Sequence, residues 1–451
     1  MTSSVDGLVS GLSTSSLISS LMQVEAAPQD RLKTKVTTAQ TAVTSYQSVN
    51  SKLSALKSAA DDLGRLSTWR AVRPTSSSTS VIATATGGTN NATGTISFDV
   101  VQLAKGQIST ARVDPTAALD VPDSITVQIG GATPVTVDVS KNKTAQGISD
   151  AINAAGINVK ATVVTTGAAQ NVLQLTGMKT GEANAFTVSG LESVGLVTAV
   201  PAQNAELQVG GTDAEGGYSV SSATNTFTGL MNGVTLTVGK EETGVTVSVA
   251  ADVSGIAAKF QALVDGANAA LSEISKQTAY DPATKKGSAL TGDFTVREMS
   301  GSIMSFVSQG LSWDDPAWVN DPNDANDKAS KISFGSLSQL GIQLDRSGQL
   351  TFDKDAFTAA YNADPSRIQT AGIALADQVE SLAGKQSATV TAVITGRKNE
   401  IDSMNSQIDN WDFRLAAKRE ALQKQYSSLE TALSNLKSQS TWLSGQIASL
   451  G

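Results

Sequence analysis

The sequence predicts a multidomain α+β protein in which a terminal α-helical coiled-coil stalk and a helical leg domain carry nested, inserted β-rich head domains. Three observations predict this class. Apolar heptad repeats lie near both ends of the chain, and the middle alternates apolar and polar residues between glycine-rich turns. The simplest arrangement inserts the β modules into the helical stalk, so that both termini return to one end. Separate β and α domains in sequence are the alternative, which leaves the two terminal repeats unpaired.

The C-terminal repeat continues to the penultimate residue. Its members are Ile401, Ile408, Leu415, Leu422, Leu429, Leu436, Leu443 and Leu450. A strict heptad of apolar residues is typical of a helix that supercoils with another helix. A helix over 401–450 is about 75 Å long, too long for one small core. We therefore expect it to bind a partner. Trp411 lies on its companion row, where core packing is expected, whereas Trp442 suits either a partner contact or stacking at the helix edge.

The N-terminal repeat has two rows, Leu32, Ala39, Tyr46, Leu53 and Ala60, and Ala42, Val49, Leu56 and Leu63. Pro28 predicts the start of this helix, since proline fits the first helical turn, and the helix is expected to end near Leu66. A shorter amphipathic stretch over 13–25 precedes it. Two surface helices of a bundle would explain both stripes. We favour pairing of the two termini, completed by other subunits, because the stripes lie at opposite ends of a long chain.

Strand patterns fill the region after Pro74. Alternation over 125–129 and 135–139 around Gly130 and Gly131 predicts a hairpin. Thr144 suits the N-cap of a helix over 145–155. With strands at 159–164, 172–175 and 186–188, this block has the order β-β-α-β-β-β. Further strands are predicted at 96–100, 207–209, 226–228, 234–238 and 245–249.

Helical periodicity returns at Gly255. Asp293 is a candidate N-cap of a second helix, and Asp364 followed by Pro365 suits the start of a third. Between them, Ser347 and Gly348 predict a tight hairpin.

Composition excludes several classes of function. The chain of 451 residues has a net charge of −8 and contains no cysteine and no histidine. Disulfides, thiolate chemistry, imidazole metal sites and Ser-His catalysis are therefore ruled out, and the acidic balance argues against nucleic-acid binding. An acidic cluster at 314–327 fails the calcium-loop pattern, because Asn326 and Ile332 stand where glycine and glutamate are needed. Paired carboxylates for glycoside hydrolysis are not excluded, but no pair stands out. We expect no enzyme, no cofactor and no metal.

The sequence shows neither a signal-peptide pattern in its first residues nor an apolar run of membrane-spanning length. The first residues have no basic region followed by an apolar core of signal-peptide length, and no apolar run is long enough to cross a membrane. These features fit a cytoplasmic protein, and they fit equally a protein exported by a route that uses no cleaved signal.

Several stretches then resemble one family. SVDGLVSGLSTSSLISSLMQVEAAP (4–28) is similar to the N-terminal signature of the bacterial flagellar filament cap protein family, also called flagellar hook-associated protein 2. QYSSLETALSNLKSQSTWLSGQIASL (425–450) resembles its C-terminus. LTGDFTVREM (290–299) and LGIQLDRSGQLTFDKDAFTAAYNADP (340–365) are similar to its conserved region beside the C-terminal coil. NTFTGLMNGVTLTV (225–238) follows the cap pattern, and 124–177 resembles a β module shared with flagellins.

The resemblance implies a ring-shaped homo-oligomer of about five subunits at the distal tip of the flagellum, outside the cell. The ring would chaperone the folding and insertion of exported flagellin. Other implied partners are the hook-filament junction proteins and a flagellar export chaperone, with no nucleic acid and no membrane insertion. Export without a cleaved signal peptide is also implied. An adhesin or surface-binding module at the flagellar tip is the alternative.

The implied division of the chain has four parts. Residues 1–42 with 412–451 form a terminal coiled-coil region that is disordered when unassembled, and 43–75 with 255–411 form the helical leg domain. Residues 76–115 with 205–254 form one β-rich head domain, and 116–204 form a second, of flagellin type. Long helices with one apolar stripe gain most of their stability from packing, so the ends are expected to fold on docking.

The residues predicted to carry oligomerisation and filament docking are the apolar members of the terminal stripes. They are Leu17, Leu21, Val24, Leu32, Tyr46, Leu53, Ile401, Ile408, Leu415, Leu422, Leu429, Leu436, Leu443, Ile447 and Leu450.

Overall fold

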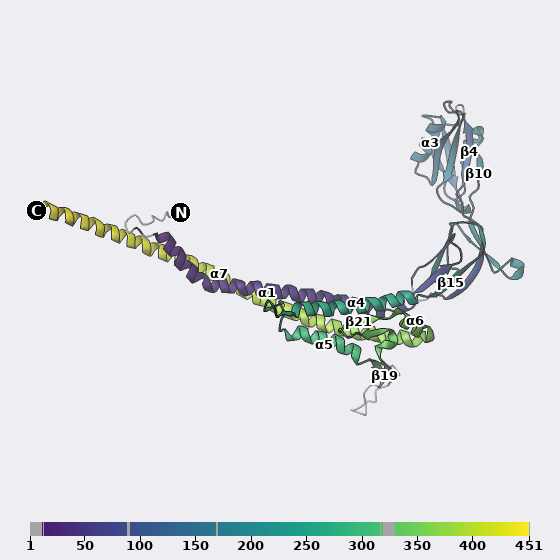
Figure 1. Cartoon of the computed structure of the whole chain (residues 1–451). Coiled ribbons are helices and arrows are strands. Elements are labelled where there is room, and N and C mark those ends of the chain that lie inside the picture. Colours follow the sequence, from purple (N-terminus) through teal and green to yellow (C-terminus); the bar gives the residue numbers. More distant parts are fainter. Residues whose placement is uncertain are drawn as a thin grey trace. The chain divides into compact units, whose positions relative to one another are not determined.

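The computed structural model describes residues 11–450 except 12, 88–90, 168–169, 316 and 319–329. It divides into two compact units. The helical unit takes the described residues up to Gly64 and those from Ala257 onward, and the β unit is Arg65–Ile256. The predicted multidomain α+β class, with β-rich modules inserted into a helical framework, is confirmed (Figure 1).

The helical unit is built on two long helices. Its helices are α1 (Thr14–Gly64), α4 (Val253–Thr278, which begins in the β unit), α5 (Phe294–Ser308), α6 (Lys354–Ala363), α7 (Pro365–Leu450) and the 3-10 turn η4 (Leu337–Leu340). Three small hairpins join them: β16 (Tyr280–Asp281) with β17 (Lys286–Gly287), β18 (Leu311–Asp314) with β19 (Lys331–Gly335), and β20 (Ile342–Leu344) with β21 (Leu350–Phe352). The predicted turn at Gly348 is confirmed, since Leu344 pairs with Leu350.

The two N-caps predicted after Gly255, Asp293 and Asp364, are confirmed. The Asp293 carboxylate accepts a hydrogen bond from the Val296 N–H at 3.1 Å at the start of α5. The Asp364 carboxylate accepts one from the Arg367 N–H at 3.0 Å at the start of α7. Both satisfy N–H groups that have no partner within the helix.

The prediction that Pro28 begins a helix is wrong. Pro28 lies inside α1, which runs without a break from Thr14 to Gly64. Proline removes the hydrogen bond to the carbonyl four residues earlier and crowds it. That carbonyl belongs to Val24, whose side chain is exposed, so water can reach this face of the helix. The apolar stripe also continues across Pro28, and packing along it outweighs the local cost.

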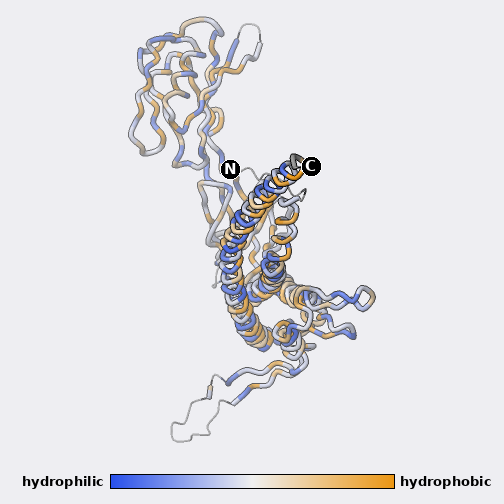
Figure 2. The backbone as a smooth tube through the Cα atoms, turned by 90° about the vertical axis from the view of Figure 1, so that its left-hand side faces the viewer, coloured by the Kyte–Doolittle hydropathy of each residue, from blue (hydrophilic) through white to orange (hydrophobic). Residues whose placement is uncertain are grey.

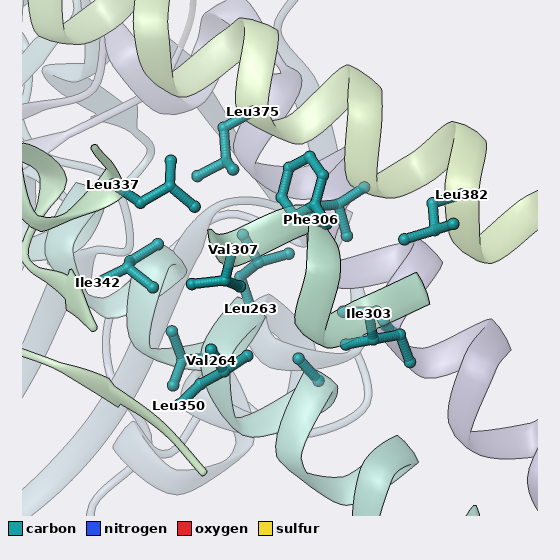
Figure 3. Close-up of a pocket in the computed structure, with 13 residues that line it drawn as sticks. Leu263, Val264, Ile303, Phe306, Val307, Leu337, Ile342, Leu350, Leu375 and Leu382 are labelled. Carbon is teal, nitrogen blue, oxygen red and sulfur yellow. The ribbon is translucent and has the colours of Figure 1, made fainter. Parts of the chain in front are cut away.

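The helical unit has one apolar core where α1, α4, α5, α6 and α7 meet. Phe260 and Phe357 are fully enclosed in it, with ring centroids 4.7 Å apart. The helical unit also contains an apolar cavity of about 30 Å³, lined by residues from α1, α4, α5, η4, the β20–β21 hairpin and α7 (Figure 3). The core therefore fixes the inner part of α7 against four other helices.

The β unit consists of two antiparallel modules, one nested in the other. The first module pairs its strands in the orders β1-β15-β3-β11-β12 and β13-β14-β2. Its strands are β1 (Val72–Ser76), β2 (Val81–Ala85), β3 (Gly94–Gln102), β11 (Ala205–Val209), β12 (Tyr218–Ser222), β13 (Thr226–Thr228), β14 (Val234–Val238) and β15 (Glu242–Ala251). The short helix α2 (Leu66–Trp69) and the 3-10 turn η3 (Asp213–Glu215) complete it. Pro74 lies in β1, an edge strand, where its missing N–H breaks no ladder.

The second module is inserted between β3 and β11. Its sheets have the orders β10-β4-β8-β7 and β6-β5-β9. The elements are β4 (Ile108–Val113), β5 (Ser124–Ile129), β6 (Val135–Asp138), α3 (Ala145–Ala154), β7 (Val159–Gly167), β8 (Gln170–Gly177), η1 (Glu182–Asn184), β9 (Phe186–Ser189), η2 (Glu192–Val194) and β10 (Val197–Val200). The predicted β-β-α-β-β-β order is confirmed, as is the hairpin of β5 with β6. Thr144 caps α3 by accepting a hydrogen bond from the Gly147 N–H at 3.2 Å.

Candidate interaction surface

The two long helices lie side by side and run antiparallel. The Lys57 ammonium is 2.7 Å from the Glu380 carboxylate, Ser387 donates to Asn50 at 2.7 Å, and Gln29 donates to Asp412 at 2.6 Å. Partners therefore rise in number along α7 as they fall along α1. Because α1 begins at Thr14, α7 continues past it as a single helix (Figure 1).

The paired helices have an inner and an outer part. We define the inner coil as residues 29–64 of α1 with 365–412 of α7, and the outer coil as residues 14–28 with 413–450. In the inner coil most of the α1 stripe is enclosed from Ala39 onward, whereas Leu32 is half-buried. Its buried apolar residues are Ala39, Val43, Tyr46, Val49, Leu53, Leu56, Ala60 and Leu63. Hydrophobic colour alternates with hydrophilic colour along both helices (Figure 2).

The outer coil leaves most of its stripe exposed. On α1 only Thr14, Ile18 and Met22 are buried there, while Leu17, Leu21 and Val24 are exposed. On α7 the exposed large apolar residues of this part are Phe413, Leu429, Leu436, Trp442, Leu443 and Ile447. Leu429, Leu436, Leu443 and Ile447 lie on the repeat face of α7, whereas Phe413 lies off it. Exposed apolar residues that gather on one helix face indicate an interaction site.

The predicted docking residues fall into three groups by exposure. Tyr46, Leu53 and Ile401 are buried inside the subunit. Leu32, Ile408, Leu415 and Leu422 are half-buried along the seam. Leu17, Leu21, Val24, Leu429, Leu436, Leu443 and Ile447 are exposed. The side chain of Leu450 lies outside the described residues, as do residues 321–327 of the acidic cluster.

The two tryptophans of α7 differ in their surroundings. Trp411 is half-buried, and the Arg414 guanidinium lies 4.2 Å from the centre of its ring, which is a cation–π contact. Trp442 is 66% exposed in the single-helix part of α7, which leaves its face available for a partner.

A polar junction ties the inner coil to the start of α5. The Tyr46 hydroxyl donates to the second carboxylate oxygen of Asp293, whose first oxygen caps α5. Burial, together with the hydrogen bond and charge of Asp293, raises the pKa of Tyr46 to about 12. Asp293 lies within LTGDFTVREM, so one carboxylate of that segment joins α1 to α5.

Two features of this surface were missed from the sequence. The predicted helix start at Pro28 would place Gln29 in the first turn of a helix, but its side chain is buried against α7. The second apolar row of α7, which accompanies the repeat of Ile401, also changes its spacing from that repeat. Met404 and Trp411 each lie four residues before a repeat residue. The half-buried Tyr426 and Leu433 each lie four residues after one. A straight helix drifts from a seven-residue repeat, so the changing offset was the available signal.

The described residues contain neither a metal-holding cluster nor a membrane-spanning helix. No group of three acidic side chains there is placed to hold a metal ion. None of the described helices combines the length and the apolar character needed to cross a bilayer.

Comparison with protein families places these elements in a known pattern. Residues 10–107 match the model described as flagellar hook-associated protein 2 N-terminus, and residues 202–438 match the model of its C-terminus. The two matches cover the first β module and nearly all of both long helices. The stretch between them contains the second β module.

Individual relatives agree with this match. The chain is 27% identical to the flagellar hook-associated protein 2 of Escherichia coli, over 98% of this chain and 97% of that protein. It is 23% identical to the lateral flagellar hook-associated protein 2 of Vibrio parahaemolyticus, over 74% of this chain and 76% of that one. A crystal structure of the Escherichia coli flagellar cap protein FliD superposes with a TM-score of 0.56 at 25% identity, covering 78% of this chain and 99% of that chain.

Proposed function

This chain belongs to the flagellar hook-associated protein 2 family, and on that premise we propose that it is the filament cap of a bacterial flagellum, which chaperones the folding and insertion of exported flagellin. The cap is a ring-shaped homo-oligomer at the distal tip, outside the cell, and reaches it without a cleaved signal peptide. Its other proposed partners are the hook-filament junction proteins and a flagellar export chaperone. The role is structural, since the relatives are described as hook-associated and cap proteins.

One observation carries this proposal: the outer coil exposes a leucine row that α1 is too short to cover. Leu429, Leu436 and Leu443 continue the repeat of Ile401, yet each of the three is about half exposed or more, while Ile401 is buried. Burial of such a side chain stabilises a complex by roughly 1.5–3 kcal/mol. The row therefore favours docking against neighbouring subunits and the filament.

The proposed mechanism uses the modest stability of this docking. An outer coil whose apolar stripe is only half covered can release and rebind as the filament lengthens. A fully buried stripe could be released only if the subunit unfolded. None of the features of the described residues favours the adhesin alternative.

A triple substitution tests the role of the exposed row. Leu422→Asp, Leu429→Asp and Leu436→Asp place three charges in the docking seam, where an unpaired charge is costly to bury. We expect cells that carry this variant to lose filament growth and motility and to shed unpolymerised flagellin into the medium.

The matched control is Gln423→Asp, Ser427→Asp and Ser438→Asp, which adds the same charge to exposed positions of the same helix off the repeat. Its filaments should reach normal length. Normal filaments with the leucine variant, while secretion of both proteins is equal, would contradict the proposal.

Mass measurement tests the ring directly. The purified full chain should form a closed oligomer of several copies, and a fragment of residues 41–411, which lacks the whole outer coil and residues 29–40 and 412 of the inner coil, should be mainly monomeric. A full chain that stays monomeric at every concentration at which the fragment is soluble would count against a ring built through the outer coil.

A further inference from the structure

We infer that a polar junction holds the two β modules together as one rigid body, and that Thr180, Asn204 and Asn225 are the positioning residues that fix the second module relative to the first. This property goes beyond the proposed function, although a ring would use it, because every subunit would then present the same surface. The junction lies inside the β unit, so its rigidity is measured independently of filament growth.

The two modules are connected by two short linkers. Residues 103–107 join β3 to β4, and residues 201–204 join β10 to β11. Each module has its own apolar core, and no described residue belongs to both core clusters. Motion between domains is the default where no large apolar interface joins them. The linkers alone would therefore let the second module swing.

The two linkers pair with each other. Lys105 and Gln203 form an antiparallel bridge, in which each backbone N–H donates to the carbonyl of the other residue, at 3.0 and 3.1 Å. The Gln203 side-chain amide also donates to the Leu103 carbonyl at 2.8 Å. The Gln102 side-chain amide donates to the Asn204 carbonyl at 2.8 Å. The linkers therefore form one short ladder instead of two independent hinges.

The first module holds this ladder through Asn225. Its side-chain oxygen accepts a hydrogen bond from the Ala104 N–H at 2.7 Å, and its side-chain nitrogen donates to the Ala104 carbonyl at 3.3 Å. Ala104 is buried in the core of the first module, where backbone groups without a partner are costly. One amide thus satisfies both backbone groups of a buried linker residue, which fixes that linker on the first module.

The second module holds the other side of the ladder. The Asn204 side-chain oxygen accepts a hydrogen bond from the Glu182 N–H at 3.0 Å. Gln107, which is buried, pairs through its side-chain amide with both backbone groups of Phe186, at 2.8 and 2.9 Å. Both linkers are therefore bound to the second module as well as to each other.

The two modules also touch directly. The Thr180 hydroxyl of the second module donates to the Ala223 carbonyl of the first module at 2.6 Å. Gly181 follows at a φ of +96°, and any β-carbon at this position would lie 2.7 Å from the Ala223 β-carbon. Glycine permits both the backbone conformation and the close approach. This third attachment opposes the hinge motion that the linkers alone would allow.

Distances between spin labels on the full chain test the junction, and labelling is specific because the chain contains no cysteine. Ala154→Cys on α3 and Ala250→Cys on β15 provide one exposed position on each module. An excess of unlabelled chain limits the signal to pairs within one subunit. We expect one narrow distribution, similar in width to that of a pair within the second module, Ala154→Cys with Thr136→Cys.

Loss of the junction should widen the distance distribution between the modules. Asn225→Ala combined with Thr180→Val removes the hold on the ladder and the direct hydrogen bond, and should widen it about twofold. Asn204→Ala should widen it by a smaller factor. The matched control combines Asn232→Ala with Thr243→Val, two exposed positions of the first module, and should leave the width unchanged. The pair within the second module should stay narrow in every variant.

A substitution at Gly181 separates positioning from stability. Gly181→Ala places a methyl group against Ala223 and should shift the mean distance between the modules. Gly195→Ala adds the same group at another positive φ, +68°, with nothing within 4 Å. The control variant therefore carries similar backbone strain, and its mean distance should not shift.

A distribution between the modules that is several times wider than the one within the second module, in the chain with no other substitution, would overturn the inference. An unchanged width in the double variant and in Asn204→Ala would overturn it too. Circular dichroism and the pair within the second module show that each variant remains folded. Neither result would bear on the cap proposal, which filament growth decides.

Discussion

At the scale of single residues, the junction of Tyr46 with Asp293 is the most informative contact of the helical unit. Asp293 serves two helices at once, as the cap of α5 and as the acceptor for the Tyr46 hydroxyl. We expect Tyr46→Phe to lower the free energy of unfolding by about 1–3 kcal/mol at neutral pH, because the half-buried Asp293 carboxylate loses its hydrogen bond from the buried tyrosine. Urea unfolding followed by circular dichroism measures this change.

The same residue predicts a pH dependence. The pKa of Tyr46 is raised from its ordinary value of 10.0 to about 12 in the folded chain, so the folded state keeps a proton that the unfolded state releases. The stability linked to this group is complete below pH 10 and is lost as the pH rises towards 12. Wild-type stability should therefore fall more steeply over this interval than that of Tyr46→Phe. Parallel curves would show that Tyr46 is not linked to folding.

At the scale of elements, the same residue type has different effects along the coil. Leu53 on α1 is fully enclosed, whereas Leu436 on α7 is 60% exposed. Leu53→Ala should destabilise the subunit by about 2–5 kcal/mol, and Leu436→Ala should change it by less than about 0.5 kcal/mol. Thermal unfolding of the two variants measures this contrast. Equal losses would show that the outer coil is folded into the monomer as firmly as the inner coil.

The cavity in the helical core predicts a stabilising change. Val264 on α4 lines it and is buried (Figure 3). Val264→Ile adds one methylene group to a space of about 30 Å³, and filling it should raise the free energy of unfolding by about 0.5–1 kcal/mol. Val264→Ala is the opposing control and should lower it. A loss of stability with isoleucine would mean that the core has no room for the added group.

Local signals in the sequence predicted many of the helices and strands. The strands that were not predicted depend on pairing with residues far away in the sequence. The β5–β6 hairpin, α3 with its Thr144 cap and the turn at Gly348 depend on neighbours in sequence. Strand β1 was not predicted, because it contains Pro74 and its partner β15 lies more than 150 residues away. Strands β2, β4, β10 and β12 are short or polar and were also missed. Pro28 was misassigned because packing overrode a reliable local rule.

The sequence predicted the apolar stripe of α7 but not which of its residues are exposed, because exposure depends on contacts with a distant part of the chain. The repeat looks the same from Ile401 to Leu443, yet its exposure rises from 7% to 55%. Exposure depends on where α1 begins beside α7, and that length is not encoded in the repeat itself. The heptad pattern therefore identified the stripe, and the position of Thr14 decides which part of it is free for a partner.

At the scale of the whole molecule, the β unit is a self-contained insertion. The chain enters and leaves it at neighbouring points, where the Asp252 N–H donates to the Ala71 carbonyl at 2.9 Å. Each of its modules has its own apolar core. We expect a fragment of residues 65–256 to fold alone, with a β-type circular dichroism spectrum and a cooperative thermal transition.

The complementary deletion variant replaces residues 65–256 by a short glycine-serine linker. Because the helical unit keeps its own core, it should remain helical and unfold near the temperature of its transition in the full chain. An unfolded fragment together with an unfolded remainder would show that the two units depend on each other for stability.

The continuity of α7 has a mechanical consequence. Its 86 residues form one helix, roughly 130 Å long, from the core to its exposed end. Residues 371, 375 and 376 near its start are buried in that core. A continuous helix transmits force along its axis. If the exposed leucines dock on the filament as proposed, a pull or a twist applied there is delivered to the opposite end of α7. Each newly added building block would thus be sensed at a distance, by leverage rather than by a diffusing signal.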